Sequence, residues 1–329
     1  MQDSRGESAD PGMSRPSEFS LIRDYFASGF PEADDILVGI GDDCSVILPA
    51  PDMVLAQSID TQVADVHFPA SAPPHLIAGR TLRCAVSDLA AMGALPQGFH
   101  LALTLPDNSE SFLKEFSRGL RDTAIALNIP LLGGDTTKGP QLIISVSVQG
   151  WLPQGQGLKR SGAKAGQDIW LSGPVGASGL ILPEVLNQPE RDDPATAPYY
   201  HPDVHISFGH LLLSMATSAI DISDGLLQDA RHIARASGVS LTLNAADIPT
   251  AVPRTDPRWA DCLSSGDDYQ LLFTAREDAR DRILACAQTA DLHSCRMIGK
   301  VTSSTDDGEV LVMENGSTLT FKRKGYEHF

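Results

Sequence analysis

Five apolar segments of this 329-residue chain run directly into an aspartate. These segments are residues 36–41 before Asp42 and Asp43, 53–59 before Asp60, 81–87 before Asp88, 129–134 before Asp135, and 211–220 before Asp221. An acid at the end of a buried strand or helix lies at the edge of a core. Where the ends of several such elements converge, their acids lie close together. Clustered carboxylates repel one another unless cations hold them. The pattern therefore predicts a divalent-metal site and, with it, phosphate chemistry.

The length and charge of the chain limit the classes of protein to consider. A chain of 329 residues predicts two domains with separate cores. Because the formal net charge is −17, a nucleic-acid partner is not expected. No segment has the roughly 20 apolar residues of a membrane span, so we expect no membrane partner. Residues 1–16 are polar and predict a disordered leader rather than a signal peptide, and the five cysteines lack CxxC spacing, so the protein is predicted to be cytoplasmic.

Alternating strand and helix patterns predict an α/β (α+β) fold in two units. Helices are predicted over residues 18–26, 74–92, 109–127, 205–216 and 225–237, with strands between them. Residues 153–166 are rich in Gly, Lys and Gln, and we interpret them as the domain junction. The predicted organisation is a leader at 1–16, an N-terminal domain at 17–152 and a C-terminal domain at 153–329.

Most of the acids also have a purely structural explanation when each is taken alone. Asp42 and Asp43 fit a polar turn, and Asp60 fits a turn after a strand. Asp88 differs, because it lies inside an apolar helical run where an unpaired acid is costly. Asp221 ends a predicted strand, and Ser223 or Asp224 could cap the helix that follows.

The glycine-rich motifs leave similar alternatives open. Residues 133–137, Gly-Gly-Asp-Thr-Thr, could bind an anion through backbone amides, with Asp135 on a metal, or form a glycine turn. Residues 173–179 have the composition of a phosphate loop but lack the Lys-Ser/Thr of a Walker A motif, which favours a helix entry. His67, among apolar residues, is more often structural than functional in such a setting.

Many acids, glycine-rich turns and few candidate bases together favour phosphoryl transfer. In that reaction the protein mainly positions groups, while Mg²⁺ held by carboxylates bridges the phosphates. If the acceptor is itself a phosphate, its oxygen is already largely anionic, since its second pKa is near ~6. A missing general base is therefore consistent with a phosphate acceptor, although it does not establish one.

An ordered set of motifs resembles one family. The motifs are Gly-Ile-Gly-Asp-Asp at 39–43, Val-Ser-Asp-Leu-Ala-Ala-Met-Gly at 86–93, Gly-Gly-Asp-Thr-Thr at 133–137, Arg-Ser-Gly-Ala-Lys at 160–164, Ile-Asp-Ile-Ser-Asp-Gly-Leu at 220–226 and Gly-Tyr-Glu-His-Phe at 325–329. Together they resemble the thiamine-monophosphate kinase family, in the superfamily of aminoimidazole ribonucleotide synthetase. The resemblance runs from about residue 18 to the end of the chain.

The resemblance implies a two-domain aminoimidazole ribonucleotide synthetase-like fold, with N-terminal strands forming a barrel in a homodimer. It also implies transfer of a phosphate from ATP to thiamine monophosphate with several Mg²⁺ ions, in line and without a protein general base. The metal ligands it implies are Asp43, Ser58, Asp60, Asp88, Asp135, Asp221 and Asp224. It places ATP on Gly134, Asp135, Arg160 and Ser223, and the substrate on His67, Asp267 and Tyr326, with the C-terminal tail closing the pocket.

Two departures from the family pattern keep alternatives open. Ile59 stands where the family often has Thr, and Asp267 stands where it has Glu. One alternative is another ATP-dependent enzyme of the same superfamily that acts on a different acceptor. The other is a catalytically inactive dimer that binds thiamine diphosphate.

Overall fold

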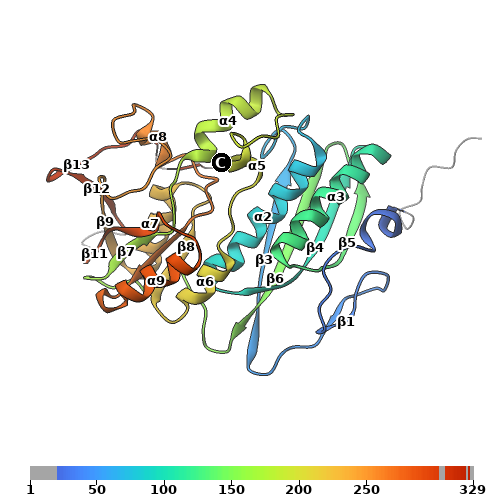
Figure 1. The fold of residues 1–329 in the computed structure, drawn as a ribbon, viewed down its shortest axis with the longest axis horizontal. Helices are drawn as coiled ribbons and strands as arrows, with labels where there is room; N and C mark the ends of the chain where they lie inside the picture. The colour runs from blue at the N-terminus through green and yellow to red at the C-terminus, as the bar shows by residue number, and fades with distance from the viewer. Residues whose placement is uncertain (1–20, 304–307, 324, 327–329) are drawn as a thin grey trace, which may run out of the picture.

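The chain forms two α/β units, each built on a sheet with helices packed against it (Figure 1). The computed structural model describes residues 21–303, 308–323 and 325–326. The predicted leader at 1–16, the start of the predicted helix at 18–26 and the last three residues of the tail motif lie outside these ranges. The predicted two-unit α/β architecture is confirmed. Within the described ranges, no helix combines the length and apolar character that crossing a membrane would need.

The first unit is a four-stranded sheet in the order β3-β6-β4-β5. β6 (Ile143–Pro153) pairs antiparallel with β3 (Met53–Val63) and with β4 (Leu95–Leu105), and β5 (Leu131–Lys138) runs parallel to β4. A small antiparallel pair, β1 (Ile36–Val38) and β2 (Val46–Ile47), precedes it. Alternate residues of β4 and β6 are buried, as a sheet with helices on one face requires.

Two helices cover one face of this sheet, α2 (Pro74–Met92) and α3 (Glu110–Leu127) (Figure 1). Both agree with the predicted helices because the sequence carries clear end signals. α2 begins with proline and ends at Gly93, which adopts a left-handed φ of 76°. α3 begins after Ser109, whose side chain accepts the N–H of Phe112.

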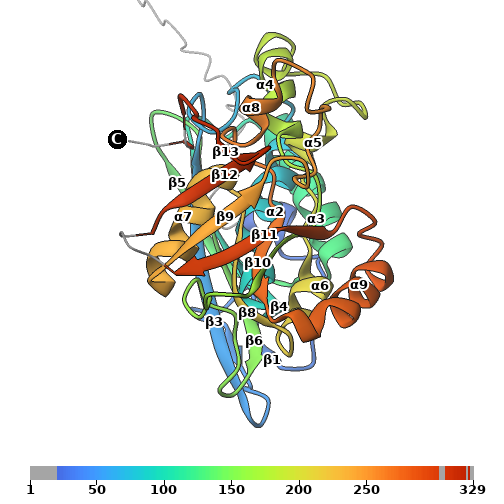
Figure 2. The ribbon, with the colours of Figure 1, turned by 90° about the vertical axis from the view of Figure 1, so that its left-hand side faces the viewer.

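The second unit is a seven-stranded sheet in the order β13-β12-β9-β11-β7-β10-β8. Its strands β12, β9 and β11 lie side by side in Figure 2. Neighbouring strands are antiparallel except β9 and β12, which are parallel. The strands are β7 (Asp168–Leu171), β8 (Ala216–Asp221), β9 (Val239–Asn244), β10 (Leu271–Ala275), β11 (Arg296–Ser303), β12 (Val310–Glu314) and β13 (Ser317–Thr318). The remaining helices are η1 (Ile22–Phe26), α4 (Ala177–Asn187), α5 (Ala197–Tyr200), α6 (Ile206–Leu212), α7 (Leu226–Ser237), α8 (Trp259–Cys262), η2 (Glu277–Ala279) and α9 (Arg280–Thr289).

One predicted helix is wrong at its end, and one of the two alternatives left open for the Gly-Gly-Asp motif is excluded. The predicted helix 205–216 ends earlier, because α6 stops at Leu212 and residues from Ala216 pair with β10 as strand β8. The Gly-Gly-Asp motif at 133–135 is not a turn, because it lies inside β5. A Cβ on Gly134 would lie 2.0 Å from the carbonyl oxygen of Leu101, so close packing of β5 on β4 requires glycine there.

α2 joins the two units, because it packs on its own sheet and also against α6 and β8. The backbones of α2 and α6 approach closely: a Cβ on Gly209 would lie 2.0 Å from the carbonyl oxygen of Ala90. Ala90 belongs to one buried apolar cluster with Phe208 and Phe273 of the second unit. This packing brings the C-terminal half of α2, which carries Asp88, to the end of β8, which carries Asp221. Both residues are predicted metal ligands.

Candidate active site

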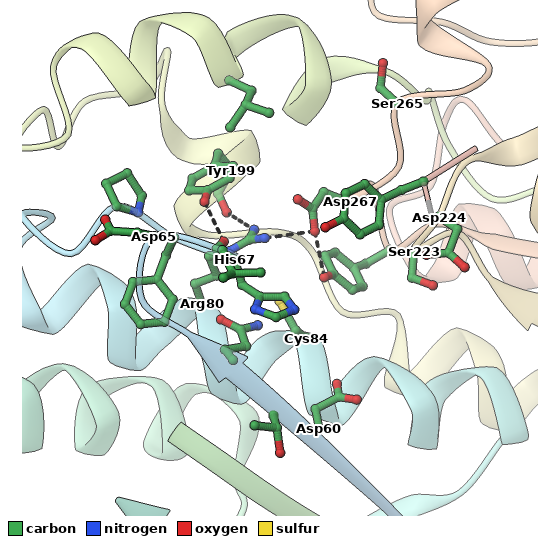
Figure 3. A pocket seen from close by; sticks show the side chains of 18 of the residues that line it. Asp60, Asp65, His67, Arg80, Cys84, Tyr199, Ser223, Asp224, Ser265 and Asp267 are labelled. Carbon is green, nitrogen blue, oxygen red and sulfur yellow. Dashed lines mark hydrogen bonds and ion pairs between the residues drawn. The ribbon is translucent and has the colours of Figure 1, made fainter. Parts of the chain in front are cut away.

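A cavity of about 690 Å³ opens between the two units and collects residues from both (Figure 3). Its lining includes most of the predicted metal and substrate residues, which come from β3, α2, the end of β8 and the segment before β10. The predicted residues that line it are Asp60, His67, Asp88, Asp221, Ser223, Asp224, Asp267 and Tyr326. Thus residues far apart in the sequence converge on a single cavity.

Three aspartates, Asp60, Asp88 and Asp221, form what we call the acid end of this cavity. Asp60 projects from β3 toward α2, Asp88 lies on α2, and Asp221 is the last residue of β8. The Ser58 hydroxyl donates to Asp88, and the Ser87 hydroxyl donates to Asp221 Oδ2 at 2.6 Å. A hydroxyl group carries no positive charge, so these hydrogen bonds leave the carboxylates repelling one another.

The electrostatics of the acid end follow from burial and from repulsion between these acids. Burial, with Asp88 as the nearest negative charge, raises the pKa of Asp60 to about 6 and that of Asp221 to about 7. Burial also raises the pKa of Asp88, while Ser58 and the positive charge of Arg160 act in the opposite direction. Oxygen ligands in this arrangement fit Mg²⁺, which prefers carboxylates and would remove the repulsion.

The opposite part of the cavity, which we call the arginine end, consists of Arg80, Tyr199, Asp267 and Tyr269. Arg80 is only 3% exposed. Its Nη2 donates to Asp267 Oδ1 at 2.8 Å, its Nη1 donates to the carbonyl of Tyr199 at 2.7 Å, and its guanidinium lies 4.0 Å from the centre of the Tyr199 ring. The Tyr269 hydroxyl also donates to Asp267 Oδ1, at 2.9 Å. The charge of Asp267 is therefore balanced inside the protein.

The segment carrying Asp267 is held in an unusual backbone conformation. Asp267 and Tyr269 both have a positive φ, 60° and 52°, which is uncommon outside glycine. Between them, both carboxylate oxygens of Asp268 accept the N–H of Gly176 at 2.8 Å, at the start of α4. The glycine-rich loop at 173–179 is thus a helix entry satisfied by the protein's own carboxylate, and not an open anion site.

His67 and Tyr326 lie at the cavity from two other directions. The His67 ring accepts the N–H of Val63 at 3.0 Å, and its carbonyl accepts the hydroxyl of Tyr199 at 2.8 Å. Tyr326 is 47% exposed, and its N–H donates to the carbonyl of Asp224 at 3.0 Å. The described part of the tail therefore reaches the cavity, with an aromatic ring that is accessible to a ligand.

Three of the predicted metal and nucleotide residues, Asp43, Gly134 and Asp135, lie at the other face of the first sheet. Asp135 pairs with Ala102, which pairs with Ser145, which pairs with Thr61, so these side chains share one face. Asp60 is adjacent to Thr61 in β3 and points the other way. Three strand spacings of about 4.8 Å put Asp135 roughly 14 Å from β3. Asp43, Gly134 and Asp135 line a second cavity of about 570 Å³.

The sequence therefore predicted one metal cluster, whereas a single chain holds two groups of acids on opposite faces of a sheet. Asp60, Asp88, Asp221 and Asp224 share the main cavity with the arginine end. Asp135 does not reach it in the same chain, because side-chain direction alternates along a strand and β3 and β5 are the two edges of the sheet. Asp43, between β1 and β2, lines the second cavity with Asp135.

The loop after β8 differs from the sequence interpretation in which Ser223 or Asp224 could cap the following helix. Neither Ser223 nor Asp224 caps α7, because Gly225 occupies the N-cap position without a side-chain bond. Instead, Asp229 of the first helical turn accepts the N–H groups of residues 223–225. Burial raises the pKa of Asp229 to about 8, while two of these N–H donors act in the opposite direction.

Several residues of the site were not singled out from the sequence, namely Arg80, Tyr199, Asp229, Asp268 and Tyr269. Arg80 carried the same signal as Asp88, a charge inside an apolar helical run, and could have been found by it. The other four had no local signal, because their roles depend on contacts between distant segments.

Models of two related domains match most of the chain. Residues 41–152 match the N-terminal domain of AIR synthase related proteins, and residues 164–312 match the C-terminal domain. The solved thiamine-monophosphate kinase of Stenotrophomonas maltophilia K279a is 35% identical with a TM-score of 0.79, covering 88% of this chain and 93% of that chain. AaThiL complexed with AMPPCP and TMP is 27% identical with a TM-score of 0.73, covering 88% of this chain and 92% of that chain.

Curated relatives agree with the structural neighbours. The thiamine-monophosphate kinase of Escherichia coli (strain K12) is 38% identical over 325 residues, covering 95% of this chain and 98% of its own length. The thiamine-monophosphate kinase of Bacillus subtilis (strain 168) is 30% identical, covering 89% of this chain and 93% of its own length. The match extends over nearly the whole of each protein, and it includes both sheets and the cavity between them. The chain therefore belongs to the thiamine-monophosphate kinase family.

Proposed function

We propose that this protein transfers the γ-phosphoryl group of ATP to thiamine monophosphate, giving ADP and thiamine diphosphate. The observation that carries the proposal is a single cavity with a buried acid end and a charge-balanced arginine end. The names of its relatives and the complex of AaThiL with AMPPCP and TMP support it.

The acid end is the part suited to Mg²⁺. Asp60, Asp88 and Asp221 would hold the metal, with Ser58 and Asp224 beside them. Asp221 is buried and the other two acids are half-buried, and among the described residues only Arg160 brings a positive charge to bear on Asp88. When bound, Mg²⁺ would supply charge neutralisation for the transferred phosphoryl group. Arg160 and Ser223 would contact ATP from the same side.

The acceptor phosphate explains why a general base is not needed. Its second pKa is near ~6, so its oxygen is already anionic at neutral pH and can attack the γ-phosphorus directly, with ADP leaving. His67, Asp267 and Tyr326 would position the thiamine moiety, with Tyr326 stacked on a ring. Direct in-line transfer requires both phosphates to meet at the acid end.

We extend the proposal to a homodimer in the cytoplasm, with domains at 17–152 and 153–329. Leu55 and Ile59 on β3 are 44% and 66% exposed and lie on the sheet face that α2 and α3 leave uncovered. Burial of this face against a second copy would form a barrel of N-terminal strands and cover the second cavity, where Asp43, Gly134 and Asp135 lie. Sedimentation velocity should give a dimer for the natural protein and a monomer for Leu55→Asp.

The activity is tested by measuring ADP release with thiamine monophosphate, thiamine and an aminoimidazole ribonucleotide precursor as separate acceptors. Only thiamine monophosphate should support turnover under saturating Mg·ATP, and thiamine diphosphate should appear in equal amount to ADP. Turnover with another acceptor alone would indicate a different ATP-dependent enzyme of the superfamily. Binding of thiamine diphosphate without any turnover would indicate an inactive dimer, and either result would overturn the proposal.

A further inference from the structure

The turn between β8 and α7, residues 222–225, connects the acid end of the cavity to the segments that carry Asp267 and Tyr326. It follows Asp221 and contains Ser223 and Asp224, which line the cavity. Its carbonyl groups hold the opposite side: Ser223 O accepts the N–H of Asp267 at 2.8 Å, and Ile222 O accepts the N–H of Tyr269 at 2.8 Å. The carbonyl of Asp224 accepts the N–H of Tyr326 at 3.0 Å.

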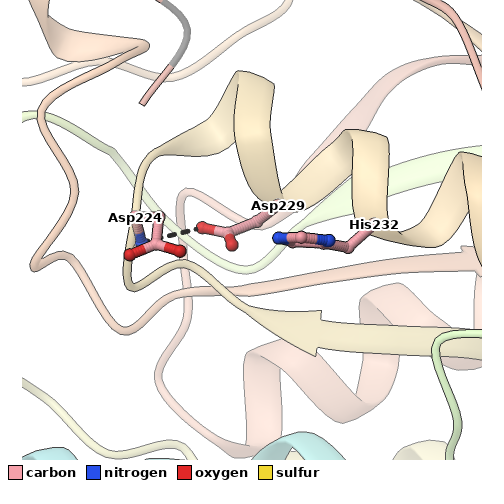
Figure 4. Close-up of side chains that lie close together, drawn as sticks. All are labelled: Asp224, Asp229 and His232. Atoms are coloured by element: carbon pink, nitrogen blue, oxygen red, sulfur yellow. Dashed lines mark hydrogen bonds between the residues drawn. The ribbon is translucent and has the colours of Figure 1, made fainter. Parts of the chain in front are cut away.

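Three of the four N–H groups of the same turn donate to one buried carboxylate, while that of Ile222 donates to the carbonyl of Gln270. Ser223, Asp224 and Gly225 each donate their backbone N–H to Asp229 Oδ2 at 3.1 Å. Asp229 is 1% exposed and does not line the cavity among the described residues. Figure 4 shows the Asp229 carboxylate beside the backbone N–H of Asp224. The Asp229 side chain therefore holds the N–H groups of a turn whose carbonyl groups hold the segment of Asp267 and the tail.

Glycine at two positions makes this arrangement tight. Gly225 has a φ of 125°, and a Cβ there would lie 3.0 Å from the backbone of Ser264. A Cβ on Gly266 would lie 2.4 Å from the carbonyl oxygen of Ser223. Because the two loops are in backbone contact, a small movement of the turn at 222–225 must displace the segment at 264–269 as well.

We propose that Asp229 is a positioning residue for the kinase reaction, which sets the turn at 222–225 so that Asp221 and Asp224 face the acid end while Asp267 and Tyr326 face the substrate. This inference deepens the proposed function and rests on it. Asp229 itself touches neither substrate. Loss of its carboxylate leaves three N–H groups without their acceptor, that of Gly225 buried and the other two partly buried, and the turn must then rearrange.

A different reading would make Asp229 a metal ligand. One ligand atom each from Asp224, Asp229 and His232 lies within 4.8 Å of the others. However, Asp229 Oδ2 is already engaged by the three N–H groups, and binding a metal through that oxygen would compete with them. The positioning role and the ligand role differ in what His232 does, because only the ligand role needs that imidazole.

The test measures Mn²⁺ affinity by electron paramagnetic resonance, on full-length variants kept well below their melting temperatures. Asp229→Ala should weaken Mn²⁺ binding about tenfold or more, the effect of about 1.4 kcal/mol or more of lost positioning. It should also raise the KM for thiamine monophosphate. Asp229→Asn, which keeps an acceptor oxygen, should recover most of both losses. Asp168→Ala, which removes a similarly buried carboxylate at the start of β7 and outside the cavity, should leave Mn²⁺ affinity within about twofold.

Three results would overturn the proposal. Unchanged Mn²⁺ affinity in a folded Asp229→Ala would mean that the residue is merely structural. Failure of Asp229→Asn to recover binding would mean that an acceptor oxygen at this position is not what matters. A loss in His232→Ala as large as in Asp229→Ala would assign both residues to a metal centre. Because Mn²⁺ affinity is measured without turnover, absence of kinase activity in the natural protein would refute the proposed function separately.

Discussion

The two ends of the main cavity hold aspartates in opposite electrostatic surroundings. At the acid end, burial and mutual repulsion raise the pKa values of Asp60, Asp88 and Asp221. At the arginine end, Asp267 lies 2.8 Å from the buried Arg80 and its charge is balanced by the protein. The difference indicates that the acid end requires a cation from outside, whereas the arginine end is complete before any ligand binds. The position of uncompensated charge therefore marks where Mg²⁺ and phosphates would meet.

The largest effect is expected from removing a charge at the acid end. Asp221→Asn should lower kcat by about 10³-fold, since several kcal/mol of metal-dependent stabilisation are lost. Its melting temperature without metal should stay level or rise, because repulsion is relieved. Steady-state kinetics and thermal unfolding measure both, with Asp291→Asn, an exposed site, as the control. Activity within a few-fold of the natural protein would remove Asp221 from the metal site.

A weaker and more selective effect is expected at the arginine end. Asp267→Asn keeps an oxygen for Arg80 and Tyr269 but removes the charge that faces the substrate. The KM for thiamine monophosphate should rise by about tenfold to a hundredfold, the effect of losing a charge-assisted hydrogen bond of roughly 1.5–3 kcal/mol. The KM for ATP should change little. Equal increases in both constants would show that the two ends are not functionally separate.

The third expectation concerns the stability of the metal-free protein as pH changes. Carboxyl groups with a raised pKa in the folded state bind more protons than in the unfolded state, so their contribution to stability is full below pH 4 and is lost as pH rises toward 7. In EDTA, the acid end should therefore lower the free energy of unfolding by on the order of 2 kcal/mol between pH 5 and pH 8.

Denaturant titration at several pH values measures the slope of the free energy of unfolding against pH. Asp221→Asn should reduce the slope in EDTA, and Mg²⁺ should also reduce it for the natural protein, because the cation favours the ionised acids. Asp267→Asn should leave the slope as it is. If Asp221→Asn leaves the pH dependence of the free energy of unfolding unchanged, ionisation of the acid end does not destabilise the metal-free protein.

The smallest effect is expected from the exposed ring of Tyr326. Tyr326→Ala should raise the KM for thiamine monophosphate about fivefold, in the range of one aromatic stacking contact, and leave the KM for ATP unchanged. Tyr326→Phe, which keeps the ring, should behave like the natural protein. Comparable losses for both substrates would contradict the stacking role and place the tail nearer to the nucleotide.

Some of this organisation was visible in the sequence because its signals are local. The bounds of α2 followed from its proline start, its apolar period and Gly93, and Asp88 was identified by its place in that apolar run. Asp221 was identified by its position at the end of a strand.

Other features depend on distant contacts and could not be read from the sequence. The face on which Asp135 lies is set by the register of β5 against β4, and the glycines that suggested a turn serve close strand packing instead. Arg80 and Asp267 form their ion pair across 187 positions of sequence. Neither Ser223 nor Asp224 caps α7, and Asp229 instead holds the N–H groups of residues 223–225 before the helix, a choice that no local preference decides.

The most direct test of the contrast between the two ends is an anomalous difference map from crystals of the natural protein grown with Mn²⁺ and AMPPCP. We expect Mn²⁺ peaks within ligand distance of Asp60, Asp88 and Asp221, and no peak at Asp267 or Arg80. A map with metal at Asp267, or with nucleotide bound and no metal at the three acids, would contradict the account.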